Sequence, residues 1–137
     1  MSSDSMPEVP RAILTGHGDL AQGMLSAVEV VSGRQGAFLP LTNRDLDRTG
    51  LESLLREVLT ATGARVVFTD LPGGSWTLAA RRLQREFHDL VIVTGTSLPA
   101  LLDFAFSDET HTAAARHAVE KGRAALNPVE PPGTAGT

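Results

Sequence analysis

The chain contains no cysteine, no tyrosine and a single tryptophan, and aromatic residues make up only 4% of it. Without cysteine it forms no disulfide, thiolate metal site or cysteine nucleophile. So few aromatic side chains leave no platform on which bases or sugars stack. The net charge of −4 argues against nucleic acid as a partner, because phosphate binding favours a basic surface. These absences alone exclude whole classes of function.

Long hydrophobic runs are also missing. No apolar stretch approaches the roughly 20 residues of a membrane span, and residues 1–7 lack the basic-then-apolar pattern of a signal peptide. We therefore expect a cytoplasmic protein. The length of 137 residues and the hydrophobic content of 42% fit one globular domain with a real core. We expect that domain over residues 11–126, with a flexible N-terminus over 1–10 and a disordered tail, rich in Pro and Gly, over 127–137.

Four β-prone segments alternate with helix-patterned segments. The expected strands are residues 12–15, 37–41, 65–70 and 90–94, and the expected helices are 20–31, 51–59, 76–87 and 98–106. Residues 108–126 also have helical composition, which we expect Gly122 to break. Pro40 marks the second strand as an edge strand, or marks the end of that strand, because proline cannot donate to a ladder. The alternation predicts an α/β fold, a three-layer α/β/α arrangement with a mainly parallel four-stranded sheet.

Glycines and serines mark the expected helix ends. Gly33 and Gly63 follow helix patterns and should end them. Ser75 and Ser97 precede helix patterns and should act as N-caps.

Three turns that contain glycine follow expected strands and should share one edge of the sheet; they are residues 15–18, 70–75 and 94–97. His17 follows the first strand and Asp70 the third, so both face one crevice if these strands are neighbours. A carboxylate that accepts from one ring nitrogen fixes the tautomer and leaves the other nitrogen as the nucleophile. This arrangement of an imidazole and a carboxylate predicts catalytic roles for His17 and Asp70.

The loop after Asp70 has the composition of an anion-binding site. Gly73, Gly74 and the helix start at Ser75 offer free backbone N–H groups. The hydroxyls of Ser75 and Thr15 are further candidate donors. A nucleophilic histidine, an orienting carboxylate and an anion cradle are the parts needed to hold a phosphoryl group on histidine.

Each feature also has an ordinary structural interpretation, since strand-end histidines are often solvated and Gly-Gly-Ser turns are common. Because the histidine, the aspartate and the Gly-Gly-Ser turn are all expected at one edge of the sheet, a catalytic role is favoured over three separate structural ones. The remaining histidines, His88, His111 and His117, lie in segments without a paired carboxylate pattern and should lie on the surface. Trp76 is equally compatible with a rim position for partner docking and with partial burial.

Metal and nucleotide chemistry find no support in the sequence. No histidine cluster or carboxylate pair has metal-site spacing, and no P-loop is present. A receiver domain needs an acidic pair after its first strand and a late lysine, whereas this chain has Thr15-Gly16-His17 there and Lys121 as its only lysine. We expect neither a metal nor a cofactor.

Three motifs together resemble the IIA component of the mannose-type family of the bacterial phosphoenolpyruvate-dependent sugar phosphotransferase system. They are Ile-Leu-Thr-Gly-His-Gly at 13–18, Phe-Thr-Asp-Leu-Pro-Gly-Gly-Ser at 68–75 and Val-Thr-Gly-Thr-Ser-Leu-Pro-Ala-Leu-Leu at 93–102. The likeness runs from about Arg11 to Phe106 and is greatest to the N-acetylgalactosamine/galactosamine branch.

The resemblance implies a phosphocarrier domain. His17 matches the histidine that would accept a phosphoryl group from phospho-HPr and pass it to a IIB protein, and the membrane would be met only through IIC and IID proteins. Asp70 matches the family's orienting aspartate, and Ser75 matches the serine that contacts the phosphoryl group. Family members are usually homodimers whose sheet is completed by a C-terminal strand.

Two departures from the family pattern stand out. Trp76 replaces the usual proline after Gly-Gly-Ser, and residues 111–126 have the pattern of a helix rather than an exchanged strand. Two alternative functions stay open. One is the phosphotransfer subunit of a phosphoenolpyruvate-dependent dihydroxyacetone kinase, and the other is a regulatory module that senses a phosphorylated partner without transferring the group.

Overall fold

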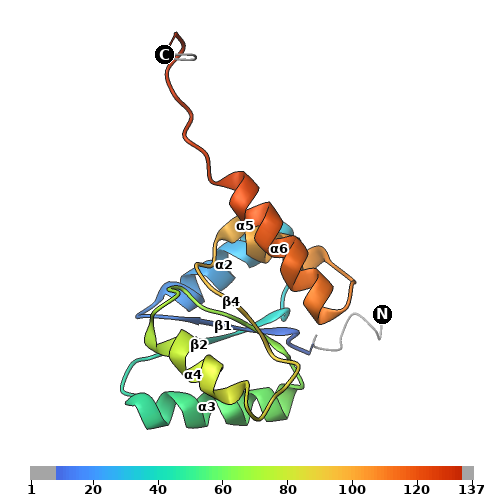
Figure 1. The fold of residues 1–137 in the computed structure, drawn as a ribbon. Coiled ribbons are helices and arrows are strands. Elements are labelled where there is room, and N and C mark those ends of the chain that lie inside the picture. Colours follow the sequence, from blue (N-terminus) through green and yellow to red (C-terminus); the bar gives the residue numbers. More distant parts are fainter. Residues whose placement is uncertain (1–8, 134–137) are drawn as a thin grey trace.

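The computed structural model describes residues 9–133 and shows a four-stranded, all-parallel sheet between two layers of helices (Figure 1). This confirms the predicted three-layer α/β/α fold. The strands are β1 (Ala12–Gly16), β2 (Phe38–Thr42), β3 (Val66–Phe68) and β4 (Val91–Val93). The helices are α2 (Leu20–Ser32), α3 (Arg48–Thr62), α4 (Ser75–Leu83), α5 (Leu98–Phe106) and α6 (His111–Ala125).

The strand order β2-β1-β3-β4 places β1 and β3 side by side at the centre of the sheet. Of the two alternatives for Pro40, the edge strand is therefore confirmed, because β2 lies at the edge of the sheet and Pro40 lies inside it rather than at its end. The chain moves from β1 outward to β2 and then returns to the other side of β1 for β3. The carboxyl ends of β1 and β3 consequently flank the point where the strand order reverses, which is where open α/β sheets form their crevice.

Alternation along the strands separates two cores. Ile13 and Val67 pack with α3 and α4 on one face, whereas Leu14 and Phe68 pack with α2, α5 and α6 on the other. Figure 1 shows α3 and α4 below the sheet and α2, α5 and α6 above it. Every residue of β1 is buried, so the strand that ends at His17 is held from both sides.

Several element ends differ from the prediction. The third strand stops at Phe68 rather than residue 70, because Thr69 and Asp70 turn into the loop before α4. The N-cap of α4 is Gly74, so Ser75 is the first helical residue and not the cap. Ser97 does cap α5, accepting from the Ala100 backbone N–H.

Gly33 and Gly63 end α2 and α3 in the left-handed conformation, with φ of 71° and 74°. Both predicted helix ends are confirmed.

Gly122 does not break the last helix, contrary to the prediction. It lies inside α6, where an added Cβ would come within 3.1 Å of both Ala100 Cβ and Ser97 Oγ. Glycine is needed there for close packing of α6 on the start of α5, a tertiary reason that outweighs its low helix propensity.

The last described residues form no fifth strand. Residues 126–133 follow α6 without helix or strand and point away from the body (Figure 1). The segments expected to be flexible or disordered include residues 1–8 and 134–137, which lie outside the described residues. Within residues 9–133, no helix has the length and apolarity needed to cross a membrane.

Candidate active site

His17 and Asp70 meet at the crevice between β1 and β3, as the sequence predicted. The His17 Nδ1 lies 2.8 Å from Asp70 Oδ2, and the His17 backbone N–H donates to the same oxygen at 2.9 Å. The imidazole side chain is 43% exposed and the carboxylate only 10%. The buried carboxylate therefore contacts Nδ1 on the side of the ring that faces the protein, while the rest of the ring stays accessible to solvent.

Two opposing influences act on the Asp70 carboxyl. Burial raises its pKa, but hydrogen bonds from the His17 ring and backbone lower it by more, so the pKa lies below its ordinary value of 3.8. The other oxygen, Oδ1, is buried without a hydrogen-bond partner among the described residues. Asp70 is thus ionised at neutral pH and accepts a hydrogen bond from Nδ1–H, which leaves the lone pair of the ring on Nε2.

This depressed pKa predicts acid sensitivity. A group whose pKa is lower in the folded state stabilises the fold above its unfolded pKa, and that contribution is lost as the pH falls through the folded value. We expect the free energy of unfolding of wild type to exceed that of Asp70→Asn at pH 6, and the difference to shrink below pH 3.8. Urea titrations of both proteins between pH 6 and pH 3 measure it. A constant difference across that range would show that the His17 contacts do not depress the Asp70 pKa.

The start of α4 lies against the imidazole. A Cβ added to Gly74 would come within 3.3 Å of His17 Cε1 and 3.2 Å of Leu71 Cβ, so glycine permits the close approach. No side chain caps this helix start. Its backbone N–H groups are therefore available to an anion beside the ring.

The remaining predicted site residues divide into two groups. Gly73, Gly74 and Ser75 form the loop and first turn of α4, and Gly74 approaches the His17 ring. Contrary to the prediction, the Gly74 N–H is not free for an anion, because it donates to the Leu71 carbonyl at 3.2 Å. Thr15 does not face the site, because it is buried and its hydroxyl donates to the Phe68 carbonyl at 2.9 Å. It joins β1 to β3 and is not a donor to a bound anion.

Sequence reasoning missed the threonines that fix the Asp70 loop. Thr69 Oγ1 and Thr77 Oγ1 lie 2.6 Å apart, and the Thr77 hydroxyl also contacts the Leu71 carbonyl at 2.6 Å. From the turn after β4, Thr96 donates to the Thr69 carbonyl. The signal was present, because threonines lie on both sides of the Asp70 loop, but only tertiary structure shows which of them are buried.

The loop after His17 is pinned by the end of β2. Gly18 adopts a φ of 58°, its N–H donates to Asn43 Oδ1, and its carbonyl accepts from the Thr42 hydroxyl. Thr42, the last residue of β2, and Asn43, which follows it, thus hold the backbone next to His17. The left-handed φ explains why glycine follows the histidine.

Trp76 is fully buried, which excludes the rim position considered from sequence. Its indole Nε1–H donates to the Gly16 carbonyl at 3.3 Å, across the crevice between α4 and β1.

The prediction that His117 has no carboxylate partner is wrong. His117 Nδ1 lies 2.7 Å from Asp103 Oδ2, and the ring is as exposed as that of His17. The pair joins the middles of α6 and α5, where helical N–H groups bond within their own helices. The His117–Asp103 pair therefore has the same histidine–carboxylate contact as the His17–Asp70 pair, but no helix begins beside it.

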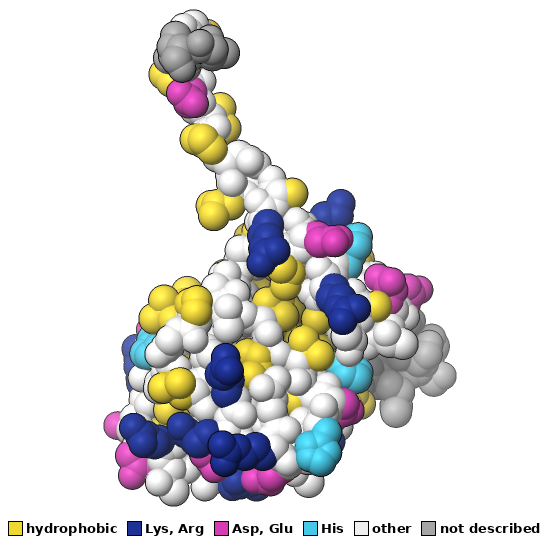
Figure 2. Space-filling model, viewed as in Figure 1, with side chains coloured by type: hydrophobic (Ala, Val, Ile, Leu, Met, Phe, Trp, Pro, Cys, Tyr) yellow, Lys and Arg dark blue, Asp and Glu magenta, His cyan; other side chains and the backbone are white. Residues whose placement is uncertain are grey.

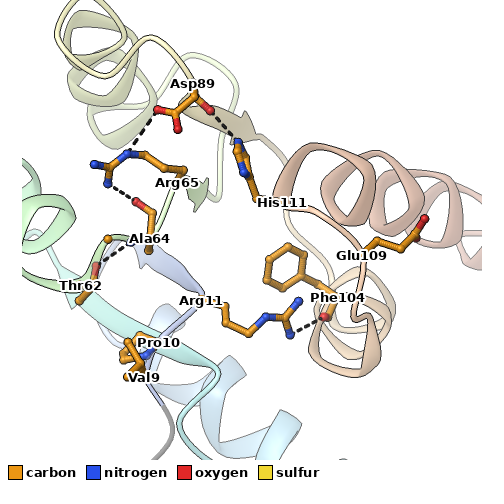
Figure 3. Close-up of a pocket in the computed structure, with 11 residues that line it drawn as sticks. Val9, Pro10, Arg11, Thr62, Ala64, Arg65, Asp89, Phe104, Glu109 and His111 are labelled. Atoms are coloured by element: carbon orange, nitrogen blue, oxygen red, sulfur yellow. Dashed lines mark hydrogen bonds and ion pairs between the residues drawn. The ribbon is translucent and has the colours of Figure 1, made fainter.

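A cavity of about 420 Å³ lies at the opposite edge of the sheet, where the strands begin (Figure 3). Three of its polar or charged lining groups bond to protein: Arg65 pairs with Asp89, His111 contacts the Asp89 carbonyl, and Arg11 donates to the Phe104 carbonyl. These contacts fasten loops and α5 to the amino ends of the strands. Among the described residues that line this cavity, no histidine pairs with a carboxylate as His17 does with Asp70.

Comparison with known proteins identifies the family of the chain. A family model described as "PTS system fructose IIA component" matches residues 11–121. The chain belongs to this family. Family membership makes it a IIA component of the phosphotransferase system (PTS), with a role in phosphotransfer and with proteins such as HPr and IIB as partners in general. No curated protein matches the chain.

Solved structures of PTS IIA proteins share the fold. The mannose/sorbose-specific IIA subunit from Enterococcus faecalis is 24% identical with a TM-score of 0.78, covering 93% of this chain and 98% of that one. An EIIA component from Streptococcus agalactiae is 20% identical with a TM-score of 0.77, covering 90% and 97%. A IIA protein associated with the fucose utilization operon of Streptococcus pneumoniae is 22% identical with a TM-score of 0.67, covering 89% and 96%.

Proposed function

We propose that this IIA protein is a histidine phosphocarrier that accepts a phosphoryl group from phospho-HPr on His17 and passes it to a IIB protein for sugar uptake. The observation that carries the proposal is the 2.8 Å contact between His17 Nδ1 and Asp70 Oδ2 beside the uncapped start of α4. We propose that the protein acts in the cytoplasm. The sequence motif Leu-Thr-Gly-His-Gly around His17 supports membership of the N-acetylgalactosamine/galactosamine branch of the family.

The transfer step uses Nε2 of His17. Its lone pair attacks phosphorus, the new N–P bond forms, and the N–P bond to the donor histidine breaks with its electron pair returning to that ring. Asp70 stabilises the positive charge that develops on the imidazole. The N–H groups at the start of α4, with Ser75 as the first residue of the helix, stabilise the phosphoryl oxygens.

The surface around His17 suits a protein donor and acceptor. Leu20, Leu71 and Leu78 are each about half exposed. Figure 2 shows hydrophobic side chains at this edge, over the starts of α2 and α4. Exposed apolar groups around a reactive ring favour a macromolecular partner over a free metabolite.

Incubation with labelled phosphoenolpyruvate, enzyme I and HPr tests the proposal. We expect label that is labile in acid and stable in base, and its transfer to a IIB protein. Label that passes only to a dihydroxyacetone kinase subunit would assign the chain to that system. Wild type that takes no label from phospho-HPr would favour a module that senses a phosphorylated partner.

We also propose that the protein is a homodimer in which the C-terminal segment of one chain lies along β4 of the other. In the described part of the chain β4 pairs only with β3, and its outer edge is open. Cavities of about 370 and 390 Å³ lie between that edge and α6, where Figure 2 shows hydrophobic side chains in a hollow. Leu126 and Val129 are almost fully exposed.

Charge supports the same pairing. Arg116 and Arg123 line the hollow, and the segment after α6 carries Glu130. Pro128 and Pro131 limit the ladder to a short one, because proline has no N–H to donate.

Sedimentation velocity measures this prediction. We expect wild type to sediment as a dimer at micromolar concentration and Val129→Lys to shift toward monomer, because a positive charge would enter the hollow beside Arg116 and Arg123. Val30→Lys changes an exposed valine of α2 and is the control. A monomeric wild type, or a Val129→Lys protein that remains dimeric, would contradict the exchange.

A further inference from the structure

Trp76 is the one tryptophan of the chain, and it connects the start of α4 to the end of β1. Its side chain is fully buried among the residues of the α3–α4 core. The indole Nε1–H reaches the Gly16 carbonyl oxygen at 3.3 Å. Gly16 directly precedes His17, so the contact acts on the peptide unit that leads into the reactive residue.

That peptide unit has two ends. The Gly16 carbonyl and the His17 N–H belong to one planar group, and in a trans peptide they point in opposite directions. Fixing the carbonyl toward Trp76 therefore fixes the direction of the His17 N–H. The N–H points at Asp70 Oδ2, the oxygen that also contacts His17 Nδ1.

We propose that Trp76 is a positioning residue for His17. Its indole N–H sets the plane of the Gly16–His17 peptide, so that Asp70 Oδ2 accepts from both the backbone and the ring of His17. This keeps the proton on Nδ1 and the lone pair on Nε2. The consequence for phosphoryl transfer rests on the proposed function, whereas the effect on the ring tautomer does not.

The position of Trp76 in the helix adds to the argument. It follows Ser75 directly, so the first turn of α4 both borders the phosphoryl site and holds the strand end that carries the nucleophile. An added Cβ at Gly16 would come within 3.2 Å of both the Ala21 backbone nitrogen and Leu20 Cβ. The peptide is therefore confined on one side by α2 and oriented on the other by the indole.

The test removes the donor and keeps the shape. Because the sequence contains one tryptophan, growth on the tryptophan analogue β-(3-benzothienyl)alanine replaces the indole N–H with sulfur at this position alone. Trp76→Phe is the second variant. Leu83→Ala, a buried change in the same helix and core that keeps the indole N–H, is the matched control for lost packing.

Nitrogen chemical shifts of the His17 ring at neutral pH measure the tautomer. We expect the Nδ1–H form to predominate in wild type and in Leu83→Ala, and a mixture of tautomers in both donor-free proteins. We also expect phosphoryl acceptance to fall about tenfold in the donor-free proteins, as is typical when an orienting contact is lost.

The proposal would be overturned if the ring nitrogen chemical shifts of His17 in the analogue-containing protein were the same as in wild type. It would also be overturned if Leu83→Ala changed these chemical shifts as much as the loss of the indole N–H does. The two hypotheses remain separable. If wild type takes no label but the tautomer changes on loss of the indole N–H, the phosphocarrier function fails and the positioning role of Trp76 stands.

Discussion

His17→Ala is expected to take up no phosphoryl label above background, a loss of at least about 10³-fold in the rate of acceptance. Among the described residues, the substitution removes the only imidazole that has both a carboxylate contact and an uncapped helix start beside it. Label transfer from phospho-HPr, followed over time in wild type and variant, measures the loss.

The chain supplies a matched control in His117→Ala. His117 has a similar exposure and a similar contact with an aspartate, 2.7 Å to Asp103. It lacks backbone N–H groups free to bind a phosphoryl group, so we expect wild-type acceptance in this variant. Label retained in His17→Ala and lost in His117→Ala would move the site to the α5–α6 pair.

Asp70→Asn is expected to slow phosphoryl acceptance by roughly 10²–10⁴-fold while the fold is kept. An amide can donate its N–H to Nδ1, which places the ring proton on Nε2 and removes the attacking lone pair. The amide also carries no charge to stabilise the imidazolium that develops during transfer. Rapid-quench measurement of label on His17, with circular dichroism to verify the fold, tests both parts of the prediction.

Asp103→Asn is the control for this change, because it makes the same substitution at the other histidine–aspartate pair. We expect it to accept label at the wild-type rate. Equal rates in wild type and Asp70→Asn would remove Asp70 from the mechanism.

The centre of the site was predictable from sequence because its geometry follows from general rules of parallel sheets. A residue after β1 and a residue after β3 meet wherever those strands are neighbours, and the glycines at 16, 18, 73 and 74 mark the turns. The order of strands and turns along the chain placed both residues at one edge of the sheet, and the strand order β2-β1-β3-β4 supplied the neighbour relation that the pairing of His17 with Asp70 required. The α/β/α layers followed from the alternation of apolar strand and helix patterns.

What sequence could not supply was the direction in which individual side chains bond. A threonine at a strand end can donate to a ligand or to the next strand, and Thr15 bonds to the Phe68 carbonyl. Gly122 looked like a helix break but allows α6 to approach α5 closely. The burial of Trp76 and the pairing of His117 with Asp103 likewise depend on contacts between elements far apart in the chain.

The position of the N–P bond tests the central claim most directly. After phosphorylation by phosphoenolpyruvate, enzyme I and HPr, the bond can be located by ¹H–¹⁵N correlation spectra of protein labelled with ¹⁵N-histidine. The account predicts a single phosphohistidine at Nε2 of His17, because Asp70 occupies Nδ1. A phosphoryl group on Nδ1 of His17, on another histidine or on none would contradict it.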